Sequence, residues 1–174
     1  MAVPLYVAVS TDTGCFQYSN TTADTHRVAA ALMDTGIDVF PLNKRHFRTK
    51  SWARLQVERL LTERMHRYED GQIAVAPVSL SLMDEAGATE EDMEDIAAFL
   101  GQIEGVETSV TIRGLAEGGC KLSVRTSGGL NATKVCARLG GGGHAAAAGC
   151  TVSGTLAEAE AAILDAIRQV EAGA

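Results

Sequence analysis

A run of four glycines and a histidine, within LGGGGHAAAAGC at residues 139–150, is the segment best suited to contact a ligand. Backbone N–H groups without neighbouring side chains can converge on a phosphate. His144, directly after the glycines, can donate a hydrogen bond to a phosphate oxygen. Two common phosphate-binding loops do not fit, because a Walker loop ends in Gly-Lys-Ser/Thr and a dinucleotide-binding loop follows a strand. The glycines alone would suit a flexible turn equally well.

The charge pattern favours an anion near this segment. The chain carries a net charge of −7, which argues against nucleic-acid binding by bulk electrostatics. However, no carboxylate occurs between Glu117 and Glu158, an interval with the bases Lys121, Arg125, Lys134 and Arg138. Acids gather instead in residues 84–95, with seven acids and no base. We therefore expect a local anion site on an acidic protein.

Arg125 and Asp12 are the other candidate site residues. Arg125 ends the alternating segment KLSVR, where its guanidinium could hold a terminal phosphate by paired hydrogen bonds, or could simply be solvated. Asp12 follows an apolar segment that resembles a buried strand, so its carboxylate could bind Mg²⁺ or Mn²⁺. Asp-Thr-Gly is also a good turn sequence, and no further metal ligand is apparent nearby.

The first part of the chain predicts a parallel βαβ unit. Residues 5–9 and 37–42 are short apolar runs, which we interpret as strands. The helix between them begins at a capping box formed by Thr21 and Asp24 and ends at Gly36. A long helix over residues 52–68 follows, and then a strand over 73–78.

The second part predicts a mixed sheet with helices. We expect a capped helix from Thr89 to residue 100, and an antiparallel hairpin of residues 106–112 and 120–125. Lys121, Ser123 and Arg125 then share the polar face of the second strand. Asn131 caps a short helix that the glycines end; a strand over 148–153 and a helix capped by Thr155 complete the chain. The fold class is α/β (α+β).

Three segments resemble one family. GGGGHAAAAG matches the GGGGHxxAAG pattern of the DHH-associated domain, the C-terminal substrate-binding module of DHH-family phosphoesterases. VSTDTGCFQYSNTT resembles the fourth motif of the catalytic DHH domain, and LSVRTSGGLN resembles the segment that binds the substrate's phosphate end. Their order is most similar to the RecJ-like nanoRNase group, which are oligoribonucleases and pAp phosphatases.

The resemblance implies a division of the chain and a set of site residues. Residues 1–46 would be the C-terminal remnant of the DHH domain, 47–70 a connector helix, and 71–174 the DHH-associated domain. Asp12 would be a metal ligand, Arg125 would anchor the far phosphate, and the substrate would also contact Asn131, Gly141, Gly142, Gly143 and His144. The partners would be short RNA or DNA oligonucleotides, pAp or related nucleotides.

The resemblance also implies hydrolysis at a centre of Mn²⁺ or Mg²⁺ ions. The sequence has no Asp-x-Asp or Asp-His-His motif, which family members carry before the DTG motif. We therefore expect little activity from this chain alone, and an N-terminal DHH portion or a homodimer as partner. The alternative is a non-catalytic nucleotide-binding module.

Composition indicates a cytoplasmic protein without a membrane segment. No apolar run approaches the roughly 20 residues of a membrane helix, and the first residues lack the basic region of a signal peptide. The four cysteines show no metal-ligand spacing, so we expect reduced thiols.

Overall fold

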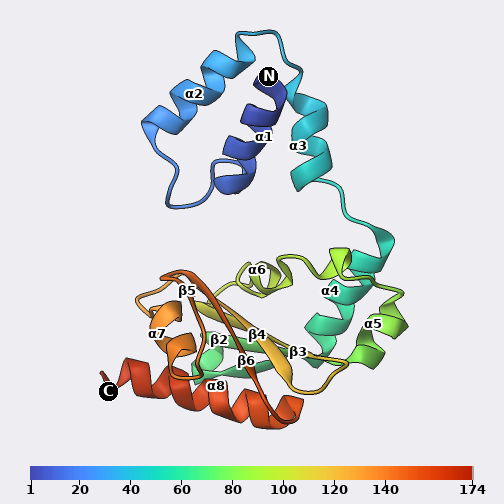
Figure 1. Ribbon diagram of the computed structural model, residues 1–174, viewed down its shortest axis with the longest axis vertical. Coiled ribbons are helices and arrows are strands. Elements are labelled where there is room, and N and C mark those ends of the chain that lie inside the picture. The colour runs from blue at the N-terminus through green and yellow to red at the C-terminus, as the bar shows by residue number, and fades with distance from the viewer. Residues whose placement is uncertain (174) are drawn as a thin grey trace. The chain divides into compact units, whose positions relative to one another are not determined.

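The computed structural model describes residues 1–173 and divides the chain into two compact units, residues 1–50 and 51–174 (Figure 1). The first unit consists of three helices: α1 (Ala2–Asp12), α2 (Ala23–Met33) and α3 (Val39–Phe47). The second contains a six-stranded sheet with helices on both faces. The predicted α/β class is therefore confirmed, whereas several predicted elements of the first unit are wrong.

Residues 5–9 and 37–42 lie in helices or in the turn before one, so the predicted strands are corrected. In α1, Leu5 is 53% exposed while Tyr6 is buried, so this run is not the doubly buried strand that we expected. Asp38 caps α3 by accepting a hydrogen bond from the backbone N–H of Phe40 at 3.1 Å. Each helix has a proline in its first turn, where the missing N–H has no intrahelical partner to lose. A short apolar run does not distinguish these helices from strands by periodicity alone.

Helix α2 is confirmed, but its capping residue differs from the prediction. Thr22 accepts a hydrogen bond from the backbone N–H of Thr25, and the Thr25 hydroxyl accepts one from the backbone N–H of Thr22. The capping box is therefore one residue later than the pair Thr21 and Asp24. In the sequence, Thr21 with Asp24 and Thr22 with Thr25 both have the spacing of a capping box, so the pattern does not distinguish them.

The sheet of the second unit has the strand order β1-β2-β3-β4-β6-β5. Only β2 and β3 pair in parallel, while every other neighbouring pair is antiparallel, so the sheet is mixed as predicted. The strands are β1 (His66–Tyr68), β2 (Ile73–Val78), β3 (Thr108–Gly114), β4 (Cys120–Thr126), β5 (Gly142–His144) and β6 (Ala147–Val152). The antiparallel hairpin of β3 and β4 is confirmed, although its first strand spans residues 108–114 and not the predicted 106–112.

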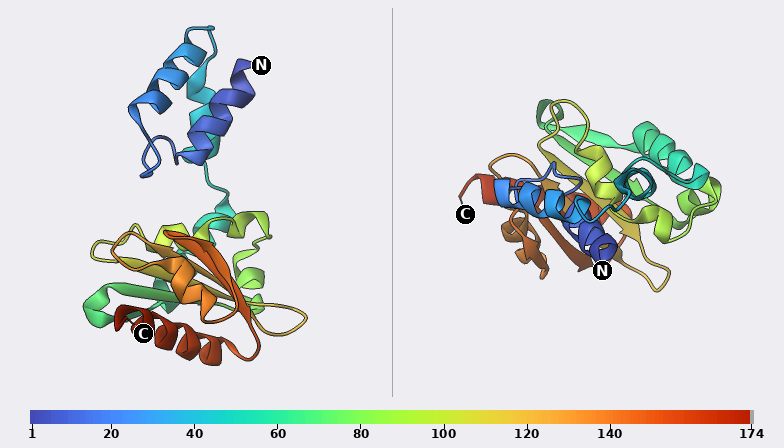
Figure 2. Two further views of the ribbon diagram at one scale, coloured as in Figure 1. Left: turned by 60° about the vertical axis from the view of Figure 1, so that its left-hand side comes forward. Right: turned by 90° about the horizontal axis from the view of Figure 1, so that it is seen from above.

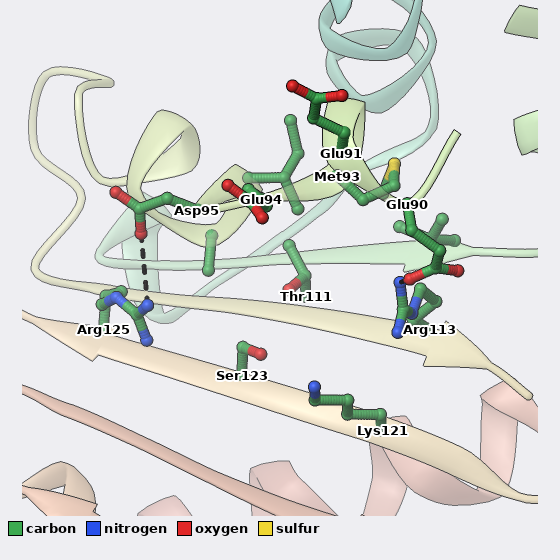
Figure 3. Close-up of a pocket in the computed structure, with 13 residues that line it drawn as sticks. Glu90, Glu91, Met93, Glu94, Asp95, Thr111, Arg113, Lys121, Ser123 and Arg125 are labelled. Atoms are coloured by element: carbon green, nitrogen blue, oxygen red, sulfur yellow. Dashed lines mark hydrogen bonds and ion pairs between the residues drawn. The ribbon is translucent and has the colours of Figure 1, made fainter. Parts of the chain in front are cut away.

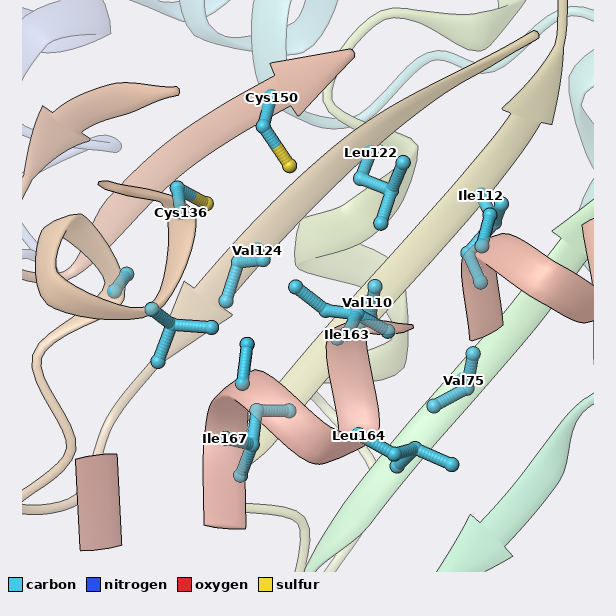
Figure 4. Packing of buried hydrophobic residues seen from close by; sticks show 14 of the residues in the cluster. Val75, Val110, Ile112, Leu122, Val124, Cys136, Cys150, Ile163, Leu164 and Ile167 are labelled. Atoms are coloured by element: carbon cyan, nitrogen blue, oxygen red, sulfur yellow. The ribbon is translucent and has the colours of Figure 1, made fainter. Parts of the chain in front are cut away.

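One face of the sheet is covered by α7 (Ala132–Ala137) and α8 (Leu156–Glu171). Figure 4 shows Val110, Leu122 and Val124 of the strands pointing toward Ile163 and Ile167 of α8. Asn131 caps α7 and Thr155 caps α8, both as predicted. Cys136 and Cys150 belong to the same core, and all four cysteines are free thiols.

The other face is covered only in part. Helices α4 (Trp52–Arg64), α5 (Leu80–Ala86) and α6 (Ile96–Leu100) supply a second core. In this core, leucines of the three helices pack with Ala74, Ala76 and Val78 of β2. Within the second unit, this second core includes no residue of β4, β6 or β5, although α6 contacts β4 (Figure 2). We call this part of the face, formed by β6, β5 and the polar residues of β4, the uncovered half of the sheet.

Two predicted helices of the second unit are shorter than expected. Helix α4 ends at Arg64, because residues 66–68 form the edge strand β1, where His66 and Tyr68 both hydrogen bond to the buried Glu160 of α8 at 2.7 and 2.8 Å. The helix predicted over 89–100 is split into a 3₁₀ turn (Glu91–Met93) and α6. Asp95 separates the two with a left-handed φ of 50°, which ends a right-handed helix.

Candidate functional site

Arg125 and His144 lie in one row across the uncovered half of the sheet. Arg125 of β4 pairs with Ala147 of β6, and Ala147 pairs with His144 of β5. Directly paired residues project to the same face, so both side chains lie on the uncovered half of the sheet. The two strands are second neighbours, about 10 Å apart. The only side chain between them is the methyl group of Ala147.

The four glycines differ in their surroundings. Gly140 follows α7 with a left-handed φ of 74°. A Cβ on Gly141 would lie 2.2 Å from the carbonyl oxygen of Gly149, and one on Gly143 would lie 2.6 Å from that of Ala147. Gly142 alone combines an ordinary φ with no atom within 4 Å of its Cβ position. Two of the glycines therefore bring β5 against β6, and Gly142 lies bare beside His144 on the uncovered face.

The segment after the glycines is fixed to the end of β4. The backbone N–H of Thr126 donates to the carbonyl of Ala146 at 3.0 Å, and the Thr126 hydroxyl donates to that of Ala145 at 3.2 Å. The Ala145 carbonyl also accepts from the N–H of Ala132, the first residue of α7. These bonds set the position of His144 relative to Arg125.

A cleft of about 580 Å³ adjoins this row between the sheet and the acidic segment 89–95 (Figure 3). We call that segment the roof. The floor carries Arg113, Lys121, Ser123 and Arg125, and the roof carries Glu90, Glu91, Glu94 and Asp95. Bases and hydroxyls of the floor thus face carboxylates of the roof, and apolar residues complete the lining: Val78, Met93, Ile96 and Ala97.

Two roof carboxylates bind the two floor arginines. Asp95 Oδ1 accepts a hydrogen bond from Arg125 Nη2 at 3.2 Å, and Glu90 pairs with Arg113. The Arg125 side chain is 34% exposed and that of Asp95 55%, so water and ions screen this pair. An external anion could therefore replace Asp95 at modest cost.

The roof is fastened to α4. Asp92 accepts hydrogen bonds from the hydroxyl of Ser51 and from the backbone N–H of Thr89, and these bonds lower the pKa of its carboxyl. Arg54 donates to the carbonyl oxygens of Asp92 and Glu94. The roof therefore depends on residues near the start of α4.

Sequence reasoning identified Arg125 and its strand face but missed Asp95, Glu90 and Arg113 as neighbours. Lys121, Ser123 and Arg125 share one face, as their alternation predicted. Arg113 could have been found as the residue opposite Lys121 in the hairpin. The paired residues of roof and floor are 23 and 30 positions apart in the chain, so no local sequence pattern indicates that they meet.

Asn131 lies apart from this cleft. Its side chain accepts a hydrogen bond from the backbone N–H of Lys134 at 3.2 Å, which caps α7. Asn131 and Lys134 line a second cavity of about 410 Å³, together with Glu107 and Gly128. The structure thus brings together Arg125, His144 and Gly142, and assigns Asn131 a capping contact.

Asp12 is the last residue of α1, in the first unit. Its backbone carbonyl and its Oδ2 both accept from Asn20 Nδ2, at 3.1 and 3.2 Å. Within residues 1–173, no three His, Cys, Asp or Glu side chains gather closely enough to hold a metal ion. A single carboxylate does not match the donor set of a two-metal centre, so we derive no step of the chemistry through a metal here.

A protein-family model, the DHHA1 domain, matches residues 70–173. The chain belongs to the DHHA1-domain family. The resemblance noted in the sequence is therefore confirmed. Of the site residues, Arg125, Asn131, the glycines and His144 fall in the matched range, whereas Asp12 precedes it.

The DHHA1 chain is similar to larger proteins. It is 37% identical over 171 residues to the bifunctional oligoribonuclease and PAP phosphatase NrnA of Thermus thermophilus. This match covers 97% of this chain and 50% of that protein. An exopolyphosphatase-related protein from Bacteroides fragilis superposes with a TM-score of 0.84 and 25% identity, over 92% of this chain and 47% of that one. This chain thus spans about half the length of these relatives.

A pGpG-specific phosphodiesterase, PggH from Vibrio cholerae, shares the fold with a TM-score of 0.54 and 14% identity, over 85% of this chain and 51% of that one. No helix within residues 1–173 of this DHHA1 protein is long and apolar enough to cross a bilayer.

Proposed function

We propose that this DHHA1 protein is the substrate-binding portion of a phosphoesterase that acts on short oligonucleotides or pAp. The observation that supports it is the row of Arg125 and His144 on the uncovered half of the sheet, with bare Gly142 beside it. A guanidinium and an imidazole on strands about 10 Å apart can contact two phosphate groups of one small ligand. The match to NrnA, whose name includes oligoribonuclease and PAP phosphatase activity, favours the same substrate class.

In this proposal Arg125 exchanges one anion for another. In the free protein the Asp95 carboxylate is paired with the Arg125 guanidinium. A phosphate, which has more charge and more acceptor oxygens, displaces this carboxylate. His144 is exposed in β5 and donates to a second phosphate oxygen. Gly142 offers an approach to the strand without a side chain in the way.

The binding part of the proposal is tested with fluorescently labelled, 5′-phosphorylated RNA dinucleotide and with unlabelled pAp as competitor. We expect Arg125→Gln and His144→Gln each to weaken binding by about tenfold, the equivalent of one charge-assisted hydrogen bond. Asp95→Asn should strengthen binding a few fold, because it removes the internal competitor, while asparagine tolerates the left-handed φ of 50°. Lys134→Gln removes a charge outside the cleft and serves as the control. Unchanged affinity in both the Arg125 and His144 variants would exclude the site.

We propose further that hydrolysis uses Mn²⁺ or Mg²⁺ with ligands beyond Asp12, from an N-terminal DHH portion or a second copy, in the cytoplasm. The chain's match to only half of NrnA supports this division of labour. The chain of 174 residues should release no mononucleotides from a short RNA with Mn²⁺ present. Metal-dependent turnover that Asp12→Ala abolishes would show that the catalytic centre is already complete.

A further inference from the structure

Arg113 and Lys121 form a pair of like charges at the end of the cleft away from Arg125. They are direct cross-strand partners of β3 and β4, and both line the cleft. Their Cβ atoms are therefore about 5 Å apart on one face, where two like charges repel and destabilise the hairpin. A pair placed in this way is stabilised by an anion between or above its two cations.

An anionic group already lies at this end of the cleft. The Glu90 carboxylate of the roof pairs with Arg113, whose side chain is 21% exposed, while Glu90 is 73% exposed. The Lys121 side chain is exposed and forms no hydrogen bond or ion pair with residues 1–173, so one of the two cations lacks a counter-charge. Figure 3 shows Glu90 directed to the floor and Glu91 directed away from it. Both ends of the cleft thus bind a carboxylate: Asp95 at Arg125, and Glu90 at Arg113.

The distance between the two ends fits a nucleic-acid backbone. Lys121 and Arg125 are four residues apart on one strand face, so their Cα atoms are about 13 Å apart. The extended repeat of a single-stranded backbone is roughly twice the rise of one strand residue, so this distance covers about two nucleotide repeats. The hydroxyls of Ser123 and Thr111 line the cleft between the two ends and can donate to the intervening phosphate.

We propose that Arg113 and Lys121 form a second phosphate subsite, which binds the phosphate two repeats away from the one that Arg125 holds. The cleft then prefers single strands of three or more nucleotides, because a 5′-phosphorylated dinucleotide reaches only one end. Glu90 occupies the second subsite in the free protein and is displaced by the longer ligand. This inference rests on the proposed binding of nucleotides at Arg125.

The test compares a 5′-phosphorylated RNA dinucleotide with a 5′-phosphorylated tetranucleotide by fluorescence anisotropy, at one low salt concentration. We expect Lys121→Gln to weaken tetranucleotide binding by about fivefold and dinucleotide binding by less than twofold. Glu90→Gln should strengthen tetranucleotide binding only, because it frees Arg113 without removing a cation. Lys134→Gln controls for the loss of one positive charge elsewhere on the domain.

The outcomes separate this inference from the proposed function. If Lys121→Gln weakens neither ligand, or both equally, the second subsite does not exist even though Arg125→Gln weakens both. If wild-type protein binds neither ligand, the proposed function fails, and the subsite with it. Thermal unfolding of each variant verifies the fold, and Glu90→Gln provides a reading that does not depend on removing a floor residue.

Discussion

Gly141 and Gly142 are neighbours in the glycine run, yet a methyl group added to each would meet different surroundings. At Gly141 it would lie 2.2 Å from the Gly149 carbonyl oxygen and 2.4 Å from Cys150 Cβ. At Gly142 it would meet no atom within 4 Å. Gly141 is therefore required for the packing of β5 against β6, whereas Gly142 lies on an open surface.

This difference predicts that one alanine substitution lowers stability and the other weakens ligand binding. Gly141→Ala should lower the free energy of unfolding by about 1–3 kcal/mol, since β5 must move away from β6. Gly142→Ala should change it by less than about 0.5 kcal/mol, but should weaken phosphate binding because its methyl group stands on the uncovered face. Urea denaturation and anisotropy measure the two effects. Equal losses of stability in both variants would contradict the assignment of roles within the run.

How much the sequence could predict depended on whether the signal was local. The alternation in β3 and β4 and the caps Asn131 and Thr155 are local, and the structure confirms them. The face shared by Lys121 and Arg125 follows from the alternation alone. The pairing of Asp95 with Arg125 does not, because it depends on where the roof lies in the fold.

Two incorrectly predicted elements have identifiable physical reasons. Residues 5–9 were predicted as a strand on apolar content, but Leu5 is half exposed and the run lies within α1. Residues 66–68 were predicted to continue a helix, but pairing with β2 and bonds to Glu160 favour a strand. Tertiary contacts override the local preference in residues 66–68, whereas in residues 5–9 the short apolar run did not distinguish a helix from a strand.

The capping box of α8 gives a pH dependence at the level of an element. Glu158 Oε2 accepts hydrogen bonds from the Thr155 backbone N–H at 2.7 Å and from its hydroxyl at 2.9 Å. These bonds hold the pKa of Glu158 below its ordinary value. A lowered pKa in the folded state means that ionised Glu158 stabilises the fold above the ordinary pKa of glutamate, and that this contribution is lost as the pH falls through the folded value.

We therefore expect Glu158→Ala to lower the unfolding temperature at pH 7, and the gap from wild type to narrow as the pH approaches 3. Glu171→Ala, at the other end of α8, is the matched control. Removing an acid from the C-terminal end of a helix should be neutral or slightly stabilising at pH 7. Thermal unfolding followed by circular dichroism across this pH range measures the difference in unfolding temperature between each variant and wild type. A Glu158 gap that stays constant with pH would refute the role of its ionised form in the cap.

At the scale of the whole molecule, both hydrophobic cores belong to residues 51–173. The core under α7 and α8 and the core under α4, α5 and α6 contain no residue of the first unit. The first unit buries only four residues, Tyr6, Ser10, Thr13 and Ala29. The family model, which begins at residue 70, leaves out α4, although Val57, Leu60 and Leu61 of that helix are fully buried in the second core.

These facts predict that the folding unit is longer than the region matched by the family. A fragment of residues 51–174 should unfold cooperatively within a few degrees of the complete chain, since it retains both cores. A fragment of residues 70–174 loses three buried apolar side chains of α4, worth roughly 5–9 kcal/mol together. This loss is comparable to the total stability of a typical domain, about 5–15 kcal/mol, so the shorter fragment should be largely unfolded. It also loses Ser51 and Arg54, which fasten the roof over Arg125. Calorimetry of the two fragments decides the matter: equal, cooperative transitions would mean that the matched region folds without α4.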